Sequence, residues 1–360
     1  MSLDARMQAI WYGRRGISWL LLWPFSCLFY LIVVMRRWAF RSGVLRSVRV
    51  NKPVIVVGNL SVGGTGKTPL IMWLANALTQ QGLKVGVITR GYGGQAKSWP
   101  QFVHAASDPL EVGDEAALIA QQTQALVFSG PDRVADAEQA IAAGAQVILS
   151  DDGLQHYRLQ RDCELAVIDG SRMIGNGSLL PAGPLREPVS RLKQVNLVLL
   201  NRRNANTASA VLNGLISEHL EYTVEPTQLR SFASGALSNE WRPLDKLKGQ
   251  QVHVVTGIGN PQAFIAALRG HGLNVSARLL PDHAVFKPAD IEFGDGLPVL
   301  MTEKDAVKCR TFATAQDDTR YSAQHWAKYW IVGAEVVMEP ATAAKLLATI
   351  QQTIASHASH

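Results

Sequence analysis

The chain has 360 residues and a mass of 39.2 kDa, which is enough for about two domains. Hydrophobic residues make up 47% of it and charged residues only 18%, which excludes a disordered chain and predicts a sizeable core. Three cysteines lie far apart, at Cys27, Cys163 and Cys309, so we expect reduced structural thiols and no disulfide framework. The net charge of +6 is compatible with nucleic acid, anionic lipid or a phosphorylated substrate. Because basic residues gather beside one apolar run, we favour lipid and expect no nucleic-acid partner.

An apolar run without charged residues covers positions 17–35. A helix of this length spans roughly 28 Å, close to the ~30 Å thickness of the hydrocarbon core of a bilayer. Trp19 and Trp38 lie near its ends, where aromatic side chains favour the membrane interface. Arg36 and Arg37 follow it directly, without a small-residue cleavage site, so a membrane anchor is favoured over a secretory signal peptide.

The basic residues around this run predict its orientation. They are more numerous after the run than before it, which places the rest of the chain on the cytoplasmic side. Pro24 and the marginal length leave three alternatives for the helix. It spans the bilayer, lies in one leaflet or, less favoured, is a buried helix of a soluble domain.

The segment 54–69, V-I-V-V-G-N-L-S-V-G-G-T-G-K-T-P, has the pattern of a phosphate-binding loop (P-loop) between a strand and a helix. Backbone N–H groups wrap a polyphosphate where no Cβ intervenes, and the helix N-terminus adds its dipole. We expect eight consecutive residues to bind the nucleotide: Ser61, Val62, Gly63, Gly64, Thr65, Gly66, Lys67 and Thr68. Among them, Lys67 is expected to reach the β- and γ-phosphates and Thr68 to ligate Mg²⁺. The strict pattern has glycine in place of Ser61, so this loop is a variant.

Strands and helices alternate through positions 54–200, which predicts an α/β fold with a P-loop NTPase-like, doubly wound, mostly parallel sheet. Strands are expected at 54–57, 83–89, 126–128, 147–149, 165–168 and 195–200, and helices at 70–78, 116–122 and 132–143. Ligands of such sheets bind at the carboxyl ends of the strands.

A polar stretch at 201–250 interrupts this alternation, with a helix expected near 208–221 and an extended segment at 222–232. Strands at 251–256, 274–280, 298–301 and 329–335 and helices at 261–271, from 303, and at 341–354 then predict a second, smaller α/β domain. We expect four parts: an N-terminal membrane-anchoring helix at 1–45, a P-loop core domain at 46–220, an interdomain connection at 221–250 and a smaller C-terminal α/β domain at 251–360.

Acidic residues follow or precede apolar segments at two places. Asp151 and Asp152 come directly after an expected strand, where a P-loop protein keeps the acidic group that orients Mg²⁺, and we favour this role over a simple turn. Asp114, with Glu115, opens an apolar helix. The residues alone favour an acidic first turn there over a general base that accepts the proton of an attacking hydroxyl.

Two further residues have open interpretations. His283 ends an expected strand beside Asp282, and the residues alone favour a structural role over a catalytic one. Arg186 lies in a proline-rich loop at 180–188, where it either clamps a phosphate or is solvated.

Eight sequence blocks occur in the order found in one enzyme family. They are G-N-L-S-V-G-G-T-G-K-T-P (58–69), T-R-G-Y-G-G (89–94), V-G-D-E (112–115), D-D-G-L-Q-H-Y-R-L (151–159), N-G-S-L-L-P-A-G-P-L-R-E-P (176–188), G-I-G-N-P (257–261), P-D-H (281–283) and T-E-K-D-A-V-K (302–308). Together they resemble the tetraacyldisaccharide 4'-kinase (lipid A 4'-kinase) family, and the apolar run in front of them matches as well.

This resemblance implies that the chain uses ATP and Mg²⁺ to phosphorylate the 4'-hydroxyl of a tetraacylated glucosamine disaccharide 1-phosphate. The implied place of action is the cytoplasmic face of the inner membrane, with this glycolipid and the membrane lipid as partners. The family's residues carry over as three groups: a base dyad of Asp114 and His283, a magnesium group of Thr68, Asp151 and Asp152, and two cations for the γ-phosphate, Lys67 and Arg186.

Two other functions remain as alternatives. One is a membrane-tethered P-loop ATPase switch, which hydrolyses nucleotide to change partners. The other is a kinase for a soluble sugar or cofactor precursor, which would leave the membrane helix without a purpose.

Overall fold

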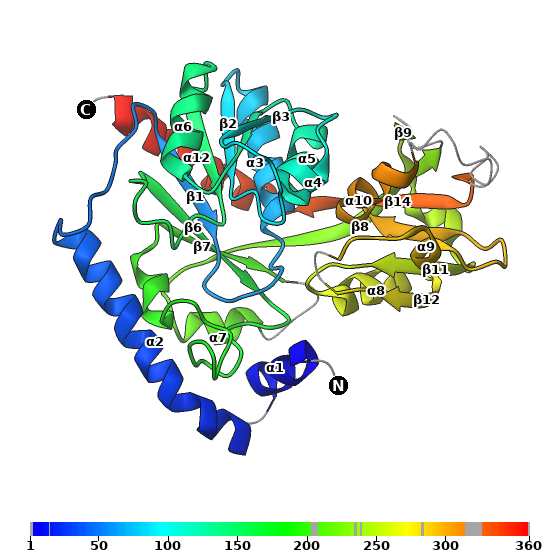
Figure 1. Ribbon diagram of the computed structural model, residues 1–360, viewed down its shortest axis with the longest axis horizontal. Coiled ribbons are helices and arrows are strands. Elements are labelled where there is room, and N and C mark those ends of the chain that lie inside the picture. Colours follow the sequence, from blue (N-terminus) through cyan, green and yellow to red (C-terminus); the bar gives the residue numbers. More distant parts are fainter. Residues whose placement is uncertain are drawn as a thin grey trace.

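Figure 1 shows the computed structural model of the chain, which describes residues 3–13, 15–202, 208–233, 236–237, 240–281, 284–313 and 326–358. The described strands form one 14-stranded sheet with the order β12-β11-β13-β14-β8-β7-β6-β1-β5-β2-β4-β3, and β9 and β10 pair with β8. The strands are β1 (Val54–Gly58), β2 (Val85–Thr89), β3 (Gln101–Val103), β4 (Leu126–Ser129), β5 (Val147–Asp151), β6 (Cys163–Asp169), β7 (Leu197–Asn201), β8 (Leu220–Ala233), β9 (Ala236–Leu237), β10 (Arg242–Pro243), β11 (Gln251–Thr256), β12 (Asn274–Leu279), β13 (Val299–Thr302) and β14 (Tyr329–Val337).

Helices cover both faces of this sheet (Figure 1). They are α1 (Leu3–Tyr12), α2 (Ile17–Arg41), α3 (Lys67–Gln80), α4 (Pro109–Val112), α5 (Asp114–Gln122), α6 (Arg133–Ala142), α7 (Ala208–Asn213), α8 (Pro261–Gly270), α9 (Pro288–Ile291), α10 (Glu303–Ala313) and α12 (Pro340–Ala358), with 3-10 turns at Val189–Gln194 and Leu244–Leu247. The predicted α/β class, with a mostly parallel sheet and an apolar N-terminal helix, is confirmed.

Strand β1 shows why a doubly covered sheet forms here. All five of its residues are buried, as expected for a parallel strand with helices on both faces. Ile55 and Val57 pack in the cluster that contains α3 and α5, whereas Val54 and Val56 pack in the opposite cluster, which contains α6. Alternate side chains of one strand therefore belong to two separate cores.

Strand β8 joins two halves of the sheet, which we call the P-loop half (β1 to β7 with their helices) and the far half (β11 to β13 with α8 to α10). Its first residues pair in parallel with β7, from Leu199↔Leu220 onward. The rest of it pairs antiparallel with β14. The helix predicted at 208–221 is wrong in its second part, because α7 ends at Asn213 and Leu220 already begins β8. The segment 221–250, predicted as a connection, thus contains the strand shared by both halves.

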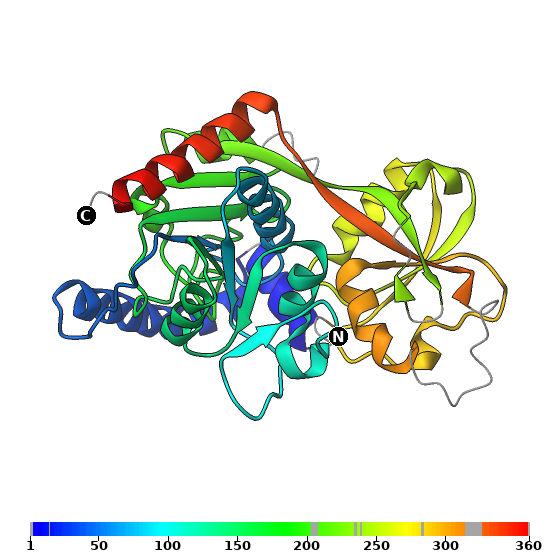
Figure 2. The ribbon, with the colours of Figure 1, turned by 90° about the horizontal axis from the view of Figure 1, so that it is seen from above.

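The last helix, α12, packs on the P-loop half, although the chain reaches it from the far half (Figure 2). Its Leu346 and Ile350 are fully buried in the same cluster as Leu70 and Leu74 of α3. The positions 341–354, predicted within the smaller C-terminal unit, therefore complete the core beneath the P-loop helix.

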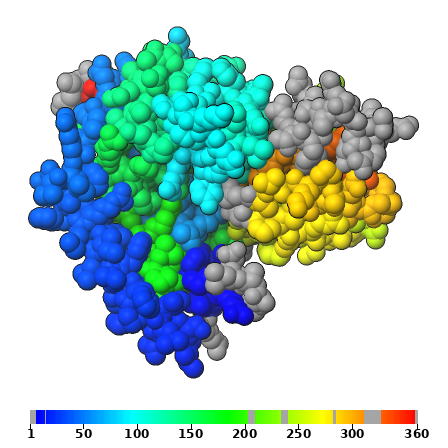
Figure 3. Space-filling model, in the orientation of Figure 1, coloured from blue at the N-terminus to red at the C-terminus, as the bar shows by residue number. Residues whose placement is uncertain are grey.

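Helix α2 lies along the outside of the P-loop half (Figures 1 and 3). Among its described side chains only Ser26 is buried, and large apolar side chains such as Leu21 and Met35 are 68% and 67% exposed. The alternative of a buried soluble helix is therefore wrong. By length and composition alone α2 is able to cross a membrane.

Candidate active site

The P-loop lies between β1 and α3, as its sequence predicts. Helix α3 begins at Lys67, and its N-cap Gly66 has a φ of 87°, in the left-handed region that favours glycine. A Cβ at Gly66 would also lie only 2.4 Å from Nδ2 of Asn201, which donates to the carbonyl of Thr65. The loop thus turns into the helix N-terminus, so the helix dipole and free N–H groups point toward its mouth.

A second loop packs against the P-loop and brings in Arg186. Ser61 and Leu185 form an antiparallel bridge, and the Val62 N–H donates to the carbonyl of Pro184 at 2.9 Å. The Arg186 N–H donates to the carbonyl of Leu60 at 2.6 Å. This backbone pairing fixes Arg186 beside a loop that is distant in sequence.

Four polar side chains then meet at the carboxyl end of β1. The guanidinium of Arg186 donates to both oxygens of Asp152 at 2.8 and 2.9 Å, a bidentate pair, and also to Oδ1 of Asn59. The ammonium of Lys67 lies 2.8 Å from Oδ1 of Asn59 and 3.3 Å from Asp152. Burial alone raises the pKa of Asp152, but Lys67 and Arg186 outweigh it and hold that pKa well below its usual range.

Asp151 is the last residue of β5, level with Val57 of the neighbouring β1. Its carboxyl is buried, and its Oδ1 has no hydrogen-bond partner within the described part of the chain. Burial, followed by the charge of Glu115, raises the pKa of Asp151 to about 7. A positive charge close to Asp151 would offset the energetic cost of burying its carboxylate, and a divalent cation is the natural candidate.

The residues at this edge fit Mg²⁺. Two adjacent carboxylates, Asp151 and Asp152, follow β5, and the hydroxyl of Thr68 lies in the first turn of α3. Mg²⁺ is typically held by one or two carboxylates together with substrate phosphates and water. Across the described ranges no group of three His, Cys, Asp or Glu side chains could hold a metal, which is consistent with such an open site.

Asp114 lies in the first turn of α5 and faces α10 of the far half. Its Oδ2 lies 3.7 Å from the ammonium of Lys304 and 3.6 Å from that of Lys308, and its side chain is nearly buried. Glu115, next in the chain, accepts from Lys304 at 3.2 Å. His283, the predicted partner of Asp114, lies outside the described residues. The structure therefore brings Asp114 to the boundary between the two halves without testing the dyad.

The far half also contacts the P-loop through the G-I-G-N-P block. Arg172 donates to the carbonyl of Gly259 at 2.8 Å, and Asn260 donates to Asp169 at 3.3 Å. A Cβ at Gly64 would lie 3.7 Å from the Cα of Gly259. This block therefore borders the loop where a nucleotide is expected.

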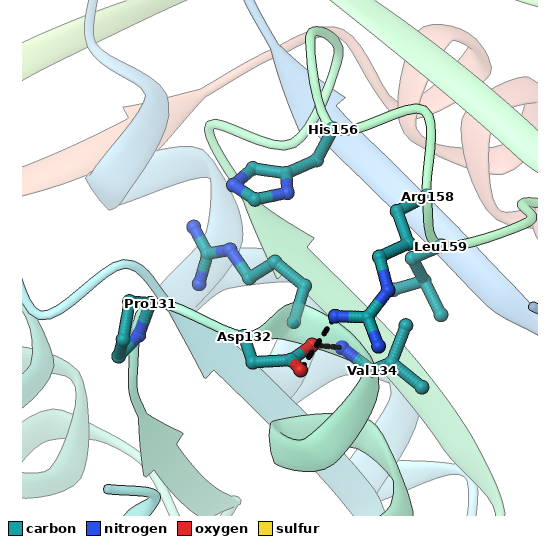
Figure 4. A pocket seen from close by; sticks show the side chains of 7 residues that line it. Pro131, Asp132, Val134, His156, Arg158 and Leu159 are labelled. Carbon is teal, nitrogen blue, oxygen red and sulfur yellow. Dashed lines mark hydrogen bonds and ion pairs between the residues drawn. The ribbon is translucent and has the colours of Figure 1, made fainter. Parts of the chain in front are cut away.

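A pocket of about 210 Å³ opens between the start of α6 and the segment at 156–159 (Figure 4). Arg133 and Arg158 give it a basic lining, with His156 beside them, and Asp132 accepts from Arg158 within it. Arg133 also donates to the backbone carbonyl of Asp151, so the pocket adjoins the end of β5. Burial, and then the charges of Arg133 and other arginines, lower the pKa of His156 to about 4, so its imidazole is neutral at neutral pH.

Sequence reasoning missed several residues of this site. Asn59 lies in the first of the recognised blocks, but its type gave no reason to single it out. Arg133 lies outside all eight blocks, and Glu115 was noted only as part of an acidic first turn. Lys304 and Lys308 belong to the block T-E-K-D-A-V-K, and their spacing of four on a helix that opens with acidic residues was the available indication.

Known proteins resemble this chain over most of its length. The family model of tetraacyldisaccharide-1-P 4'-kinase matches residues 18–351. The tetraacyldisaccharide 4'-kinase of Nitrosococcus oceani is 44% identical over 343 residues, which are 95% of this chain and 93% of the relative. The chain belongs to this family.

Two further similarities extend over almost the whole chain. The tetraacyldisaccharide 4'-kinase of Alkalilimnicola ehrlichii is 43% identical over 348 residues, which are 96% of this chain and 97% of that protein. A crystal structure of LpxK from Aquifex aeolicus in complex with ATP superposes with a TM-score of 0.71 at 26% identity, and covers 92% of this chain and 98% of that one. The prediction of a tetraacyldisaccharide 4'-kinase from eight sequence blocks is confirmed.

Proposed function

We propose that this kinase transfers the γ-phosphate of ATP, with Mg²⁺, to the 4'-hydroxyl of a tetraacylated glucosamine disaccharide 1-phosphate at the cytoplasmic face of the inner membrane. The observation that carries the proposal is the meeting of Lys67, Arg186 and Asp152 at the mouth of the P-loop, with Asp151 beside them. Phosphoryl transfer depends mainly on positioning and on neutralising charge on the transferred group. Two cations at a helix N-terminus supply both.

The roles follow from where each group lies. Lys67 and Arg186 stabilise negative charge on the γ-phosphate, since both project from backbone that is fixed by the P-loop and its paired loop. Mg²⁺ supplies further charge neutralisation when bound by Thr68, Asp151 and Asp152. The raised pKa of Asp151 supports this assignment, because a carboxylate buried without a hydrogen-bond partner on Oδ1 gains most from a cation.

Asp114 is proposed as the base that accepts the proton of the 4'-hydroxyl, with His283 as its partner. Its carboxylate faces α10 across the boundary between the two halves, where Lys304 and Lys308 contact it. The surroundings of Asp114 are complete only when both halves are in place. Such closure excludes water, which would otherwise compete with the sugar hydroxyl for the phosphoryl group.

The basic pocket of Figure 4 supports an anionic substrate. Arg133 and Arg158 line it, and Arg133 adjoins the end of β5, so a phosphate on the acceptor sugar would meet positive charge there. A soluble sugar phosphate would match this pocket equally well. The apolar helix α2 distinguishes the two substrates, because only a lipid substrate requires the enzyme at a membrane.

We further propose that α2 lies in one leaflet and does not span the bilayer. Ser26, near its middle, donates to the carbonyl of Leu179 at 2.8 Å and accepts from the Ala182 N–H at 2.9 Å. Trp19 donates to Ser178 at 3.0 Å. If α2 spanned while docked in this way, an irregular loop at 178–182 would lie at the depth of the hydrocarbon, where unpaired backbone groups are excluded.

The test is transfer of labelled γ-phosphate to the purified glycolipid in mixed micelles, measured for wild type, Asp114→Asn, His283→Ala and the double variant. We expect Mg²⁺-dependent transfer, a loss of at least 100-fold in Asp114→Asn, and a double variant little worse than Asp114→Asn alone, because residues that act as a unit are non-additive. Losses that multiply would contradict the dyad. ATP hydrolysis that is independent of added glycolipid would favour a switch instead.

A further inference from the structure

Asn59 is the first residue after β1, and it is almost completely buried, with an exposed fraction of 1%. Its backbone carbonyl accepts from Arg186 at 3.0 Å and from Gln155 at 3.3 Å. Its side chain lies between the P-loop backbone on one side and Lys67 and Arg186 on the other. Neither the family resemblance nor the motif assigns it a role.

The two ends of the Asn59 amide meet groups of opposite kind. Oδ1 accepts from the ammonium of Lys67 at 2.8 Å and from the guanidinium of Arg186. Nδ2 donates to the carbonyl of Ser61 at 2.6 Å and approaches that of Gly63 at 3.5 Å. Lysine and arginine are donors only and carbonyls are acceptors only, so the orientation of the amide is fixed by its surroundings. An aspartate would face carbonyl oxygens with a second oxygen, and an aliphatic side chain would satisfy neither end.

Asp152 also contacts both cations, but its effect on them differs. A carboxylate cancels much of the positive charge of Lys67 and Arg186, whereas an amide oxygen orients them and leaves the charge in place. Asp152 is in addition one of the proposed magnesium ligands, so its oxygens would contact the metal as well as the two cations. Among the described residues, the Oδ1 atom of Asn59 contacts only the two cations.

We propose that Asn59 is a positioning residue for phosphoryl transfer, which holds Lys67 and Arg186 side by side at the mouth of the P-loop while leaving their charge available to the γ-phosphate. This inference rests on the proposed roles of those two cations. It separates two tasks within one side chain, since Nδ2 shapes the loop and Oδ1 aligns the cations.

The experiment is a double-mutant cycle between Asn59→Ala and Arg186→Ala, with kcat and KM for ATP measured alongside ATP affinity by calorimetry without Mg²⁺. We expect Asn59→Ala to lower kcat roughly 10- to 100-fold, as for hydrogen bonds to charged groups, and to cost much less when Arg186 is already absent. Asn59→Asp should keep the oxygen that faces the cations yet weaken ATP binding, because it adds negative charge beside the phosphates.

Asn201→Ala is the matched control. Asn201 braces the same loop by donating to the Thr65 carbonyl at 3.1 Å but forms no hydrogen bond with either cation in the described part of the chain, so its effect should combine with Arg186→Ala as a simple product. If Asn59→Ala behaved in the same additive way, or lost activity only in step with Tm, Asn59 would merely shape the loop. An unchanged kcat in Arg186→Ala would overturn the role of Arg186 itself, and the inference with it.

Discussion

Asp132 is the N-cap of α6 and Asp136 lies one turn further on, and the two side chains have opposite environments. Asp136 is fully buried, and neither of its carboxyl oxygens has a hydrogen-bond partner in the described structure. Burial raises the pKa of Asp136 to about 7, although Arg133 opposes the shift. Asp132 is partly exposed and accepts from the Val134 N–H and from Arg158. Burial acts to raise its pKa as well, but these bonds outweigh it and lower that pKa.

This difference predicts opposite effects of two matched substitutions on stability. A raised pKa means that the folded chain binds a proton which the unfolded chain releases above about pH 4, so Asp136 costs stability as pH rises toward 7. Asp136→Asn should therefore be more stable than wild type at pH 8, on the order of 1 kcal/mol, and the gain should fade toward pH 5. Asp132→Asn should be less stable than wild type at pH 8. Because folding lowers the pKa of Asp132, its charged carboxylate stabilises the fold at every pH above the pKa that it has in the unfolded chain. Thermal unfolding in detergent at both pH values measures this, and a pH-independent gain in Asp136→Asn would contradict it.

At the scale of one element, α2 docks on the protein along one side and exposes apolar side chains on the others. One narrow stripe, with Trp19 and Ser26, docks on the loop at 178–182, and Arg41 reaches Gln194 at 3.2 Å. The remaining faces are apolar and exposed. Because the same loop leads to Arg186, α2 bound to a membrane as proposed would place the phosphoryl-transfer site at a fixed height above the lipid surface.

The proposed leaflet position of α2 predicts similar depths for residues along its length. Cys27 is an exposed thiol near the middle of α2, while the other two cysteines are buried, so the natural chain accepts one label there. Met35, 67% exposed and two turns further on, provides a second site as Met35→Cys in a Cys27→Ser background. Quenching of a fluorophore by lipids brominated at shallow or deep positions should place both labels at a similar, shallow depth. A label at position 27 near the bilayer centre with position 35 near the headgroups would show a spanning helix.

At the scale of the whole molecule, the two halves are connected by more than a linker. Strands β8 and β14 run from one half into the other as an antiparallel pair, from Thr223↔Val337 to Ser231↔Trp330. The chain crosses to the far half along β8 and returns along β14 to place α12 under α3. The core of the P-loop half is therefore complete only after the last helix has docked.

This arrangement predicts that a C-terminal substitution affects the nucleotide-binding half. Leu346→Ala should lower stability by about 2–5 kcal/mol, since Leu346 is fully buried in the cluster that contains α3. Leu347→Ala, next to it and only partly buried, is the control and should cost less. Hydrogen exchange should then accelerate in α3 and β1 before it does in α8 and β12. Faster exchange confined to the far half would show that α12 belongs to that half.

The sequence by itself determined the features that depend on neighbouring residues. The P-loop follows from glycines between an apolar strand and Lys67, the apolar run from its composition, and the α/β class from alternating periodicity. The order of eight blocks also identified the family. None of these features required the tertiary structure, because turn chemistry, helix starts and side-chain periodicity depend on residues that are close together in the sequence.

Only the tertiary structure decided which distant residues meet. Arg186 contacts Asn59 from 127 positions away, and Lys304 contacts Glu115 from 189 positions away. The end of α7, the shared strand β8 and the place of α12 were likewise outside the reach of local patterns. The physical reason is that a side chain's type records whether it is buried or charged, whereas its partner is set by backbone pairing between remote segments, such as the bridge between Ser61 and Leu185.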